Sequence, residues 1–220
     1  MLTVTDQPAN ATTTSPPPAA EPRVARRSVP RVLIVLALIV ACGGLGLWWV
    51  RYKTYHYVTV DEGKLYRVGN QGLHEFANAV RLSKAKTVVA LIDDEEWVDP
   101  AKPQFKDEEA YLARQGVNLV RIPVKLGGWP TRADVKQFIA IAGKAENQPV
   151  LVHCAQGVRR TGMMVAAYQR AGMGMSVRRI NDAILSFGHS ERTVKDVRKF
   201  IEVYDPNTGE VPRGMPVSNE

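Results

Sequence analysis

The segment from Pro149 to Gly162 constrains the fold and the chemistry of this chain more than any other. It reads Pro-Val-Leu-Val-His-Cys-Ala-Gln-Gly-Val-Arg-Arg-Thr-Gly. The apolar run 150–152 predicts a buried strand, and residues 161–170 have the composition of a helix. A strand, a short loop and a helix N-terminus in this order direct backbone N–H groups and the helix dipole toward a bound anion. The segment therefore predicts an anion site at the end of a buried strand.

Side chains in this loop carry the chemistry expected of a phosphate site. Cys154 begins the loop and Arg160 ends it. A thiol placed against a helix N-terminus and a guanidinium is ionised at neutral pH, so we expect Cys154 to attack phosphorus and to hold a covalent phosphoryl group. We expect Arg160 to bind two phosphoryl oxygens with its planar fork. Gly157 permits the turn that points the loop amides inward, and the hydroxyl of Thr161 is expected to donate to the Cys154 sulfur.

The pattern His153-Cys154-x5-Arg160-Thr161-Gly162 resembles the signature loop of the cysteine-based protein tyrosine phosphatases, especially of their dual-specificity branch. The resemblance runs from about Val60 to Tyr204 and includes the segments 64–69 and 87–92. It implies Cys154 as nucleophile, Arg160 as phosphate clamp and Thr161 as partner of the thiolate. It also implies that His153 supports the loop. The phosphate-binding residues that it implies are Ala155, Gln156, Gly157, Val158, Arg159 and Arg160, with the 155–159 amides as the cradle.

The general acid is missing from its usual place. Cleavage of a phosphomonoester needs a proton on the leaving oxygen, usually from a carboxylic acid. In the tyrosine-specific branch the loop before the signature reads Trp-Pro-Asp, whereas this chain has Trp129-Pro130-Thr131. Two substitutes are Asp93, in the acidic run 93–96 after a buried strand, and Asp134, whose Thr-x-x-Asp spacing also fits a helix cap. A third alternative is a substrate with a good leaving group, which needs no protein acid.

Three classes of function compete for these features. The first is a metal-independent phosphatase that hydrolyses phosphotyrosine, phosphoserine, phosphothreonine or a phosphorylated lipid or inositol. The second is a weakly active phosphate-binding module, or pseudophosphatase, that lacks the acid. The third is a rhodanese-type sulfurtransferase, but the five residues between Cys154 and Arg160, followed by Thr-Gly, fit phosphate better than the shorter rhodanese loop. The sequence favours the phosphatase, and since its histidines show no ligand spacing, we expect no metal and no cofactor.

A second segment, Val32 to Val50, predicts a membrane anchor. Its 19 residues carry no charge, and a helix of this length crosses a hydrocarbon core of about 30 Å. The tryptophans at 48 and 49 are typical of an interface belt. A cleaved signal peptide and a bacterial lipoprotein signal at Cys42 are alternatives, but the long segment before the run and the Trp-Trp end favour a single-pass anchor.

The charges beside this run predict the orientation of the anchor. Four arginines lie within the ten residues before it, whereas Arg51 and Lys53 follow it. The positive-inside rule then places the N-terminus in the cytoplasm. We therefore expect the catalytic domain on the non-cytoplasmic side of the membrane.

The 220 residues allow one ordinary domain with appendages. We expect a disordered basic tail over 1–31, a transmembrane helix over 32–50, a linker over 51–63, a phosphatase domain over 64–205 and a flexible tail over 206–220. Within the domain, strands at 64–68, 87–92, 117–124 and 150–152 alternate with helices at 73–84, 105–114, 131–146, 162–171, 176–187 and 191–204, and an acidic loop covers 93–100. This alternation predicts an α/β fold with a central, mostly parallel sheet and helices on both faces.

The charge balance points to anionic partners. The net charge of +7 suits a phosphorylated protein or a small polyanionic phosphoester. Aromatic and basic residues do not interleave, so we expect no nucleic acid. The two cysteines, Cys42 and Cys154, provide no disulfide framework. The membrane is the other expected partner, through residues 32–50, and the sequence gives no signal for an oligomeric state.

Overall fold

The computed structural model describes residues 31–208, without the side chains of Arg51 and Arg192. The tails expected over 1–31 and 206–220 therefore lie outside the described residues, apart from Arg31 and residues 206–208. The chain divides into two compact units, Met1–Gly44 and Leu45–Glu220, and the second unit contains the sheet. In chain order the elements are α1 (Arg31–Tyr52), β1 (Val58–Asp61), β2 (Leu65–Gly69), α2 (Leu73–Ser83), β3 (Thr87–Ala90), α3 (Asp94–Val98), α4 (Gln104–Gln115), β4 (Asn118–Arg121), α5 (Arg132–Gly143), the 3-10 helix Ala145–Asn147, β5 (Val150–Cys154), α6 (Arg159–Ala171), α7 (Val177–Asp182) and α8 (Glu191–Val203).

The sheet has the strand order β1-β2-β5-β3-β4, with β5 at its centre. The strands β2, β5, β3 and β4 run parallel, and β1 pairs antiparallel with β2. All five residues of β5 are buried, as expected for a parallel strand covered on both faces. The predicted mostly parallel α/β sheet is therefore confirmed.

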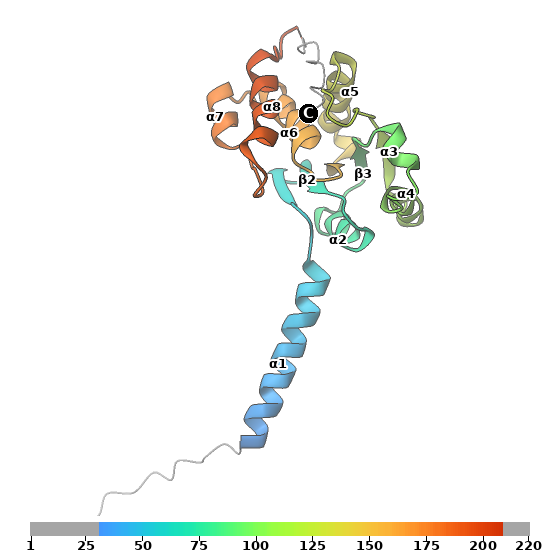
Figure 1. Cartoon of the computed structure of the whole chain (residues 1–220), viewed down its shortest axis with the longest axis vertical. Helices are drawn as coiled ribbons and strands as arrows, with labels where there is room; N and C mark the ends of the chain where they lie inside the picture. The colour runs from blue at the N-terminus through green and yellow to red at the C-terminus, as the bar shows by residue number, and fades with distance from the viewer. Residues whose placement is uncertain (1–30, 209–220) are drawn as a thin grey trace, which may run out of the picture. The chain divides into compact units, whose positions relative to one another are not determined.

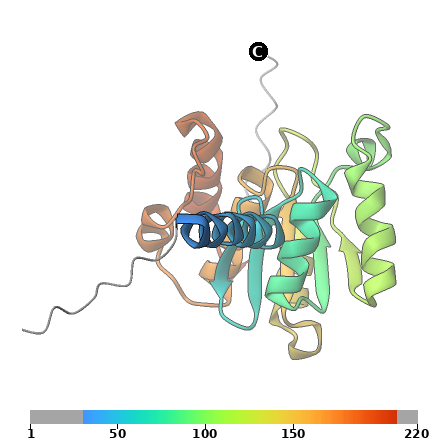
Figure 2. The same ribbon diagram turned by 90° about the horizontal axis from the view of Figure 1, so that it is seen from below.

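Two layers of helices cover this sheet. Figure 1 shows α5, α6, α7 and α8 on one side of the strands and α2 and α4 on the other. Figure 2 shows α2 in front of the strands with α4 beside it. The side chains of β5 alternate between the two layers, because Val150 and Val152 pack into one apolar cluster with Phe138 and Phe200, whereas Leu151 packs into the other. This period of two is the ordinary pattern of a strand.

Three sequence-based assignments were wrong in part. The expected linker 51–63 contains β1, a short strand whose exposed residue, Thr59, interrupts the apolar signal. The expected acidic loop contains α3, because Asp93 caps it by accepting from the Glu95 N–H, and acidic residues in a first turn favour the helix dipole. The helix expected over 176–187 ends at Asp182, and Phe187 has φ of 50°, which a helix excludes.

α1 extends three residues beyond the predicted span, since Arg31, Arg51 and Tyr52 are also helical. Within the described part of the chain, it is the one helix long and apolar enough to cross a membrane. This statement rests on length and composition, with a mean hydropathy of 2.4 over Arg31–Val50. The cysteine of the lipoprotein alternative, Cys42, is exposed on this helix.

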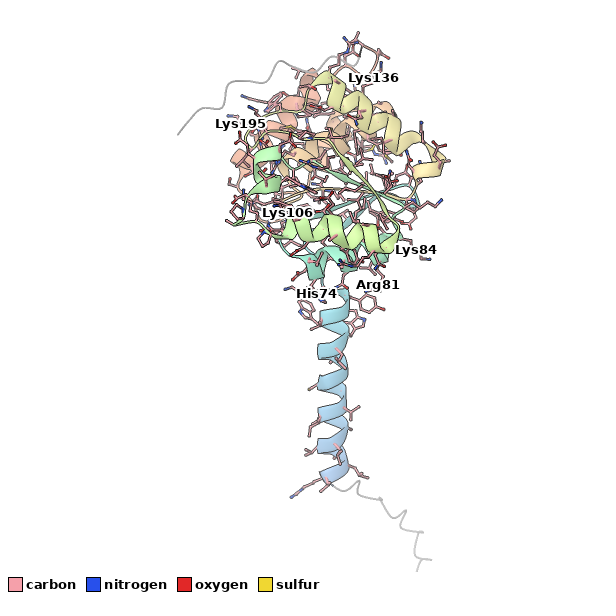
Figure 3. All side chains as sticks on the ribbon, turned by 90° about the vertical axis from the view of Figure 1, so that its right-hand side faces the viewer. His74, Arg81, Lys84, Lys106, Lys136 and Lys195 are labelled. Atoms are coloured by element: carbon pink, nitrogen blue, oxygen red, sulfur yellow. The ribbon has the colours of Figure 1, made fainter. Side chains whose placement is uncertain are left out.

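Polar contacts join the end of α1 and the residue that follows it, Lys53, to α2. Asn78 of α2 donates to the carbonyl oxygens of Val50 (3.2 Å) and Lys53 (2.9 Å). The Nζ of Lys53 lies 2.9 Å from a carboxylate oxygen of Glu75. His74, near the N-terminus of α2 and labelled in Figure 3, places its Nε2 2.8 Å from the carbonyl oxygen of Val50. These bonds satisfy carbonyl groups that the end of a helix leaves without a partner.

We predict that Asn78→Ala accelerates amide hydrogen exchange over residues 53–57. The variant removes two hydrogen bonds, each contributing about 0.5–1.5 kcal/mol. Lys106→Ala, at an exposed position of α4 (Figure 3), is the matched control and should leave this exchange unchanged. Equal exchange rates in the wild type and in Asn78→Ala would show that these bonds do not hold the segment.

Candidate active site

The residues of the signature pattern gather at the carboxyl end of the sheet. Cys154 is the last residue of β5 and pairs with Gly69, the last residue of β2. On the other side His153 pairs with Ala90, the last residue of β3. A pocket of ≈ 530 Å³ opens here, and its lining includes Cys154 and Arg160. This is the edge at which open α/β sheets bind ligands.

The loop of residues 155–158 is held from outside by its carbonyl oxygens. The Nε2 of Gln71 donates to the carbonyl oxygen of residue 155 (2.8 Å), and the Nδ1 of His56 donates to that of residue 156 (2.8 Å). The Nη2 of Arg67 donates to the carbonyl oxygens of residues 157 (2.5 Å) and 158 (3.4 Å). A planar trans peptide carries its N–H opposite its C=O. The N–H groups of residues 156–159 therefore point away from these carbonyl partners, and that of Gly157 points to the Cys154 sulfur.

The nucleophile is bonded to one of these amides. The N–H of Gly157 donates to the Sγ of Cys154 at 3.1 Å. Gly157 has φ of +70°, and a Cβ there would lie 2.5 Å from the carbonyl oxygen of Val68. Only glycine fits this close approach of the loop to β2, so the turn predicted at Gly157 is present.

Arg160 is buried beside Cys154 and is fixed by one of its nitrogen atoms. Its Nη1 donates to Glu96 Oε2 (2.5 Å) and to the carbonyl oxygens of Leu91 (3.2 Å) and Val124 (3.1 Å). Its Nε and Nη2 have no hydrogen-bond partner within residues 31–208, which leaves one edge of the guanidinium for an anion. Glu96 also lines the pocket and was not among the predicted site residues. We expected a solvated acidic loop at this position. The segment is instead the short helix α3, which buries Glu96 and Trp97.

A buried network supports the Cys154 backbone. The Nε2 of His153 lies 2.8 Å from one carboxylate oxygen of Glu108, and Asn70 donates to the other at 2.6 Å. The N–H of Asn70 donates to the carbonyl oxygen of Cys154 at 3.1 Å. All three side chains are fully buried. His153 therefore sits in a structural network, whereas sequence reasoning missed Glu108 and Asn70.

Arg67 is a buried cation next to the loop. Burial lowers its pKa to about 10, and the charge of Cys154 acts in the opposite direction. Arg67 belongs to the segment 64–69 of the family resemblance, and a cation in the middle of the strand Leu65–Gly69 is the signal that could have identified it.

Two predicted roles in the loop differ from what the structure shows. Arg159 lines the pocket, but all three nitrogens of its guanidinium are bonded within the protein: its Nε pairs with Asp196 (2.6 Å), and its Nη1 and Nη2 donate to the carbonyl oxygens of Gly128 and Gly127 (both 2.7 Å). It joins α8 to the 125–130 loop. The expected bond from Thr161 to Cys154 is not formed: the Thr161 hydroxyl is buried and has no partner among the described residues.

The two candidate acids occupy different places. Asp134 forms a capping box, since its Oδ2 accepts from the Thr131 N–H (2.7 Å) and the Thr131 hydroxyl accepts from the Asp134 N–H (3.2 Å). Asp134 does not line the pocket. Asp93 caps α3, and its Oδ2 accepts from the N–H of Leu126, a residue that does line the pocket. Both carboxylates are therefore helix caps and neither lines the pocket, but Asp93 is bonded to a residue that does.

The pocket presents donors for an anion. Its lining includes the Arg160 guanidinium, the Lys102 ammonium and the loop amides, while the Glu96 carboxylate is paired with both cations. In residues 31–208, no three His, Cys, Asp or Glu side chains gather as metal ligands would.

We predict that Glu108→Ala lowers the free energy of unfolding by about 3–5 kcal/mol, because it leaves His153 and Asn70 buried without their partner. Urea unfolding of the detergent-solubilised protein measures this loss. Glu109→Ala changes the exposed neighbour on α4 and should stay within about 0.5 kcal/mol of the wild type. Equal stabilities of the two variants would contradict the network.

Asp134→Asn should behave as the loss of a cap and not of an acid. We expect a fall of about 1 kcal/mol in the free energy of unfolding and an unchanged kcat. Thr131→Ala removes the same cap without touching the carboxylate and should give the same result. A kcat that falls in Asp134→Asn but not in Thr131→Ala would instead identify Asp134 as the acid.

Comparisons with known proteins agree with this geometry. A sequence model of the family described as "DSP-PTPase phosphatase fused to NAD+ Kinase" matches residues 61–204. A curated relative, the dual specificity protein phosphatase OPG106 of vaccinia virus (strain Copenhagen), is 32% identical over 98 residues, covering 41% of this chain and 53% of the relative. The dual specificity protein phosphatase H1 of variola virus is 31% identical over 98 residues, with the same coverage. The chain thus spans about half the length of the curated relatives it matches.

Solved structures share the fold. The core catalytic domain of the PP-IP phosphatase SIW14 from S. cerevisiae superposes with a TM-score of 0.59 at 22% identity, over 71% of this chain and 89% of that chain. TpbA of P. aeruginosa superposes with a TM-score of 0.53 at 24% identity, over 66% of this chain and 83% of that chain. At these identities the likeness concerns the fold alone.

Proposed function

The chain belongs to the dual-specificity-like branch of the cysteine-based protein tyrosine phosphatases, and from this we propose that it hydrolyses phosphomonoesters through a phosphocysteine intermediate, without a metal ion. The observation that carries the proposal is the Cys154 sulfur, bonded to the Gly157 N–H, in one pocket with the Arg160 guanidinium. This arrangement supplies a nucleophile and the donors for the oxygens of a phosphoryl group.

The reaction has two steps. The loop amides and Arg160 bind the phosphoryl oxygens, and the Cys154 thiolate attacks phosphorus while the bond from phosphorus to the leaving oxygen breaks. The leaving oxygen takes a proton from a carboxylic acid. Water then attacks the phosphocysteine, passes a proton to the resulting carboxylate and releases inorganic phosphate, which restores the thiolate.

Asp93 is the acid that we favour. Its carboxylate accepts from the N–H of Leu126, which lines the pocket, whereas Asp134 is bound in a capping box with Thr131. Glu96 lies deeper, but its two oxygens pair with Arg160 and Lys102, so we assign it to the orientation of the phosphate clamp. Its contact with Arg160 holds the guanidinium by Nη1 and leaves the opposite edge for phosphate.

The substrate class follows from the pocket. Its ≈ 530 Å³ falls within the ordinary range for small-molecule sites, about 300–1,000 Å³. A phosphorylated protein side chain or a small polyanionic phosphoester, including a phosphorylated lipid or inositol, fits the donors at its wall. SIW14 is described as a PP-IP phosphatase, and a TpbA variant was solved with pTyr, so both substrate types occur on this fold. The alternative of a weakly active binding module is not favoured, because the curated relatives are phosphatases.

Residues 32–50 are proposed to anchor the chain in a membrane as a single-pass helix, followed by the phosphatase domain over about 64–205. The arginines before the span favour the domain on the non-cytoplasmic side. The alternatives at the N-terminus, a signal peptide or a lipoprotein signal at Cys42, would change the attachment and not the chemistry of the domain.

Phosphate release from an aryl phosphate tests the thiolate mechanism. The full-length protein, assayed in detergent with chelator present, should turn over, and Cys154→Ser should reduce the rate to background, because an unactivated hydroxyl is a poor nucleophile. Cys42→Ser changes the other cysteine, in α1, and should retain the wild-type rate. Activity that survives in Cys154→Ser, or that disappears with chelator, would contradict the mechanism.

The choice of Asp93 predicts a dependence on the leaving group. Asp93→Asn should lower kcat by about 10²–10⁴-fold on an alkyl phosphate, whose leaving oxygen needs a proton, and far less on a nitrophenyl phosphate. Asparagine still caps a helix, so α3 is preserved. Asp94→Asn, at the exposed neighbour paired with Arg121, is the control and should match the wild type on both substrates. Equal losses on the two substrates in Asp93→Asn would show that Asp93 is not the acid.

A further inference from the structure

Phe187, in the connection between α7 and α8, contacts two of the side chains that hold the phosphate loop. Its ring is stacked on the imidazole of His56, with the ring centroids 4.3 Å apart and the planes inclined by 15°. The guanidinium carbon of Arg67 lies 5.4 Å from the centroid of the same ring, within the range of a cation–π contact. His56 and Arg67 together bond the carbonyl oxygens of residues 156–158. One aromatic ring therefore supports the partners of three loop carbonyls.

The imidazole of His56 is held by a ring on each of its faces. The ring of Tyr55 is stacked on it as well, with a centroid distance of 3.9 Å and an angle of 28°. Two rings stacked at such distances cannot share one face, so His56 lies between Tyr55 and Phe187. The backbone of Tyr55 is fixed to the end of β2, because its carbonyl oxygen accepts from the Gly69 N–H at 2.8 Å. Phe187 closes the other face of the imidazole.

The backbone conformations at this stack are unusual. Among residues 31–208, three residues other than glycine have a positive φ, and two of them are His56 (58°) and Phe187 (50°). The left-handed region is unfavourable for a bulky side chain. Such conformations persist where the surrounding contacts determine them, and they concentrate at functional sites. Two unfavourable conformations are thus maintained at a single contact.

The contacts continue from this stack to the nucleophile. The peptide group that joins residues 156 and 157 offers its oxygen to His56 and its N–H to the Cys154 sulfur, at 2.8 and 3.1 Å. Because this group is planar, a movement of its oxygen also moves its N–H. The position of the His56 ring therefore determines whether this N–H points to the sulfur.

We propose that Phe187 is a positioning residue of the phosphatase reaction, which acts through His56 on the peptide group that donates to Cys154. Phe187 does not line the catalytic pocket, so it has no contact with substrate. The kinetic part of this inference rests on the proposed function, whereas the effect of Phe187 on the loop does not.

Hydrogen exchange of the full-length protein in detergent tests the positioning without any reading of activity. Phe187→Leu keeps an apolar side chain but removes the flat ring, and it should accelerate exchange of the amides of residues 155–159 by about two- to tenfold, the worth of one hydrogen bond. Phe187→Tyr keeps the ring and should exchange as the wild type does. Leu185→Ala, at an exposed position of the same connection, is the matched control and should also leave this exchange unchanged.

Turnover of an aryl phosphate provides the second arm. Phe187→Leu should lower kcat by at least about tenfold, but by no more than the about 10²–10³-fold that loss of a preorganised donor costs. Phe187→Tyr should restore the wild-type value. The same change in a His56→Ala background should lower kcat by a smaller factor, because the contact through which Phe187 acts is already lost.

The proposal is overturned if Phe187→Leu leaves the exchange of the loop unchanged, if Phe187→Tyr fails to restore it, or if Phe187→Leu lowers kcat by the same factor in both backgrounds. A wild-type protein that does not turn over an aryl phosphate would contradict the proposed function instead. The exchange experiment still tests the positioning in that case, so the two proposals fail separately.

Discussion

The phosphate site depends on the way in which the carbonyl oxygens of residues 155–158 are bonded from outside. A short loop of peptide groups can point either oxygens or N–H groups at a ligand, and only the second arrangement attracts phosphate. Here His56, Gln71 and Arg67 take up the oxygens, so the opposite N–H groups are oriented before any substrate arrives, and that of Gly157 points to the Cys154 sulfur. A net contribution of about 0.5–1.5 kcal/mol per neutral bond, and about 1.5–3 kcal/mol where a charge takes part, is enough to select one peptide orientation. Such preorganisation removes the cost of turning dipoles during the reaction.

The sheet explains why these partners meet the loop. β2 lies beside β5, so its carboxyl end brings Arg67 and the following Gln71 to the start of the loop. The backbones approach so closely that a Cβ on Gly69 would lie 2.6 Å from the oxygen of Gln156. On the other side β3 leads into α3, which delivers Glu96 to Arg160. The nucleophile and the clamp therefore belong to one local segment, while the groups that orient them come from its two neighbours in the sheet.

This division explains what sequence reasoning could and could not predict. The strand, the loop, Cys154, Gly157 and Arg160 follow from a contiguous pattern, and the alternation of strands and helices was enough for the α/β fold. His56 lies 100 residues from its partner and Arg67 lies 90 from Gly157, and no local pattern encodes such pairings. The partners of Arg159, Asp196 and the 127–128 carbonyls, likewise lie over 30 residues away on either side, so the sequence could not show that they bond its guanidinium.

Trapping of the covalent intermediate tests the central claim most directly. The wild-type protein is mixed with an aryl phosphate, quenched within the first turnover into alkaline denaturant and digested, and the peptide that contains Cys154 is identified by mass spectrometry. The account predicts one phosphoryl group on the Cys154 sulfur, formed at least as fast as phosphate is released. Turnover with no phosphoryl group on this peptide, or with the group on another residue, would contradict it.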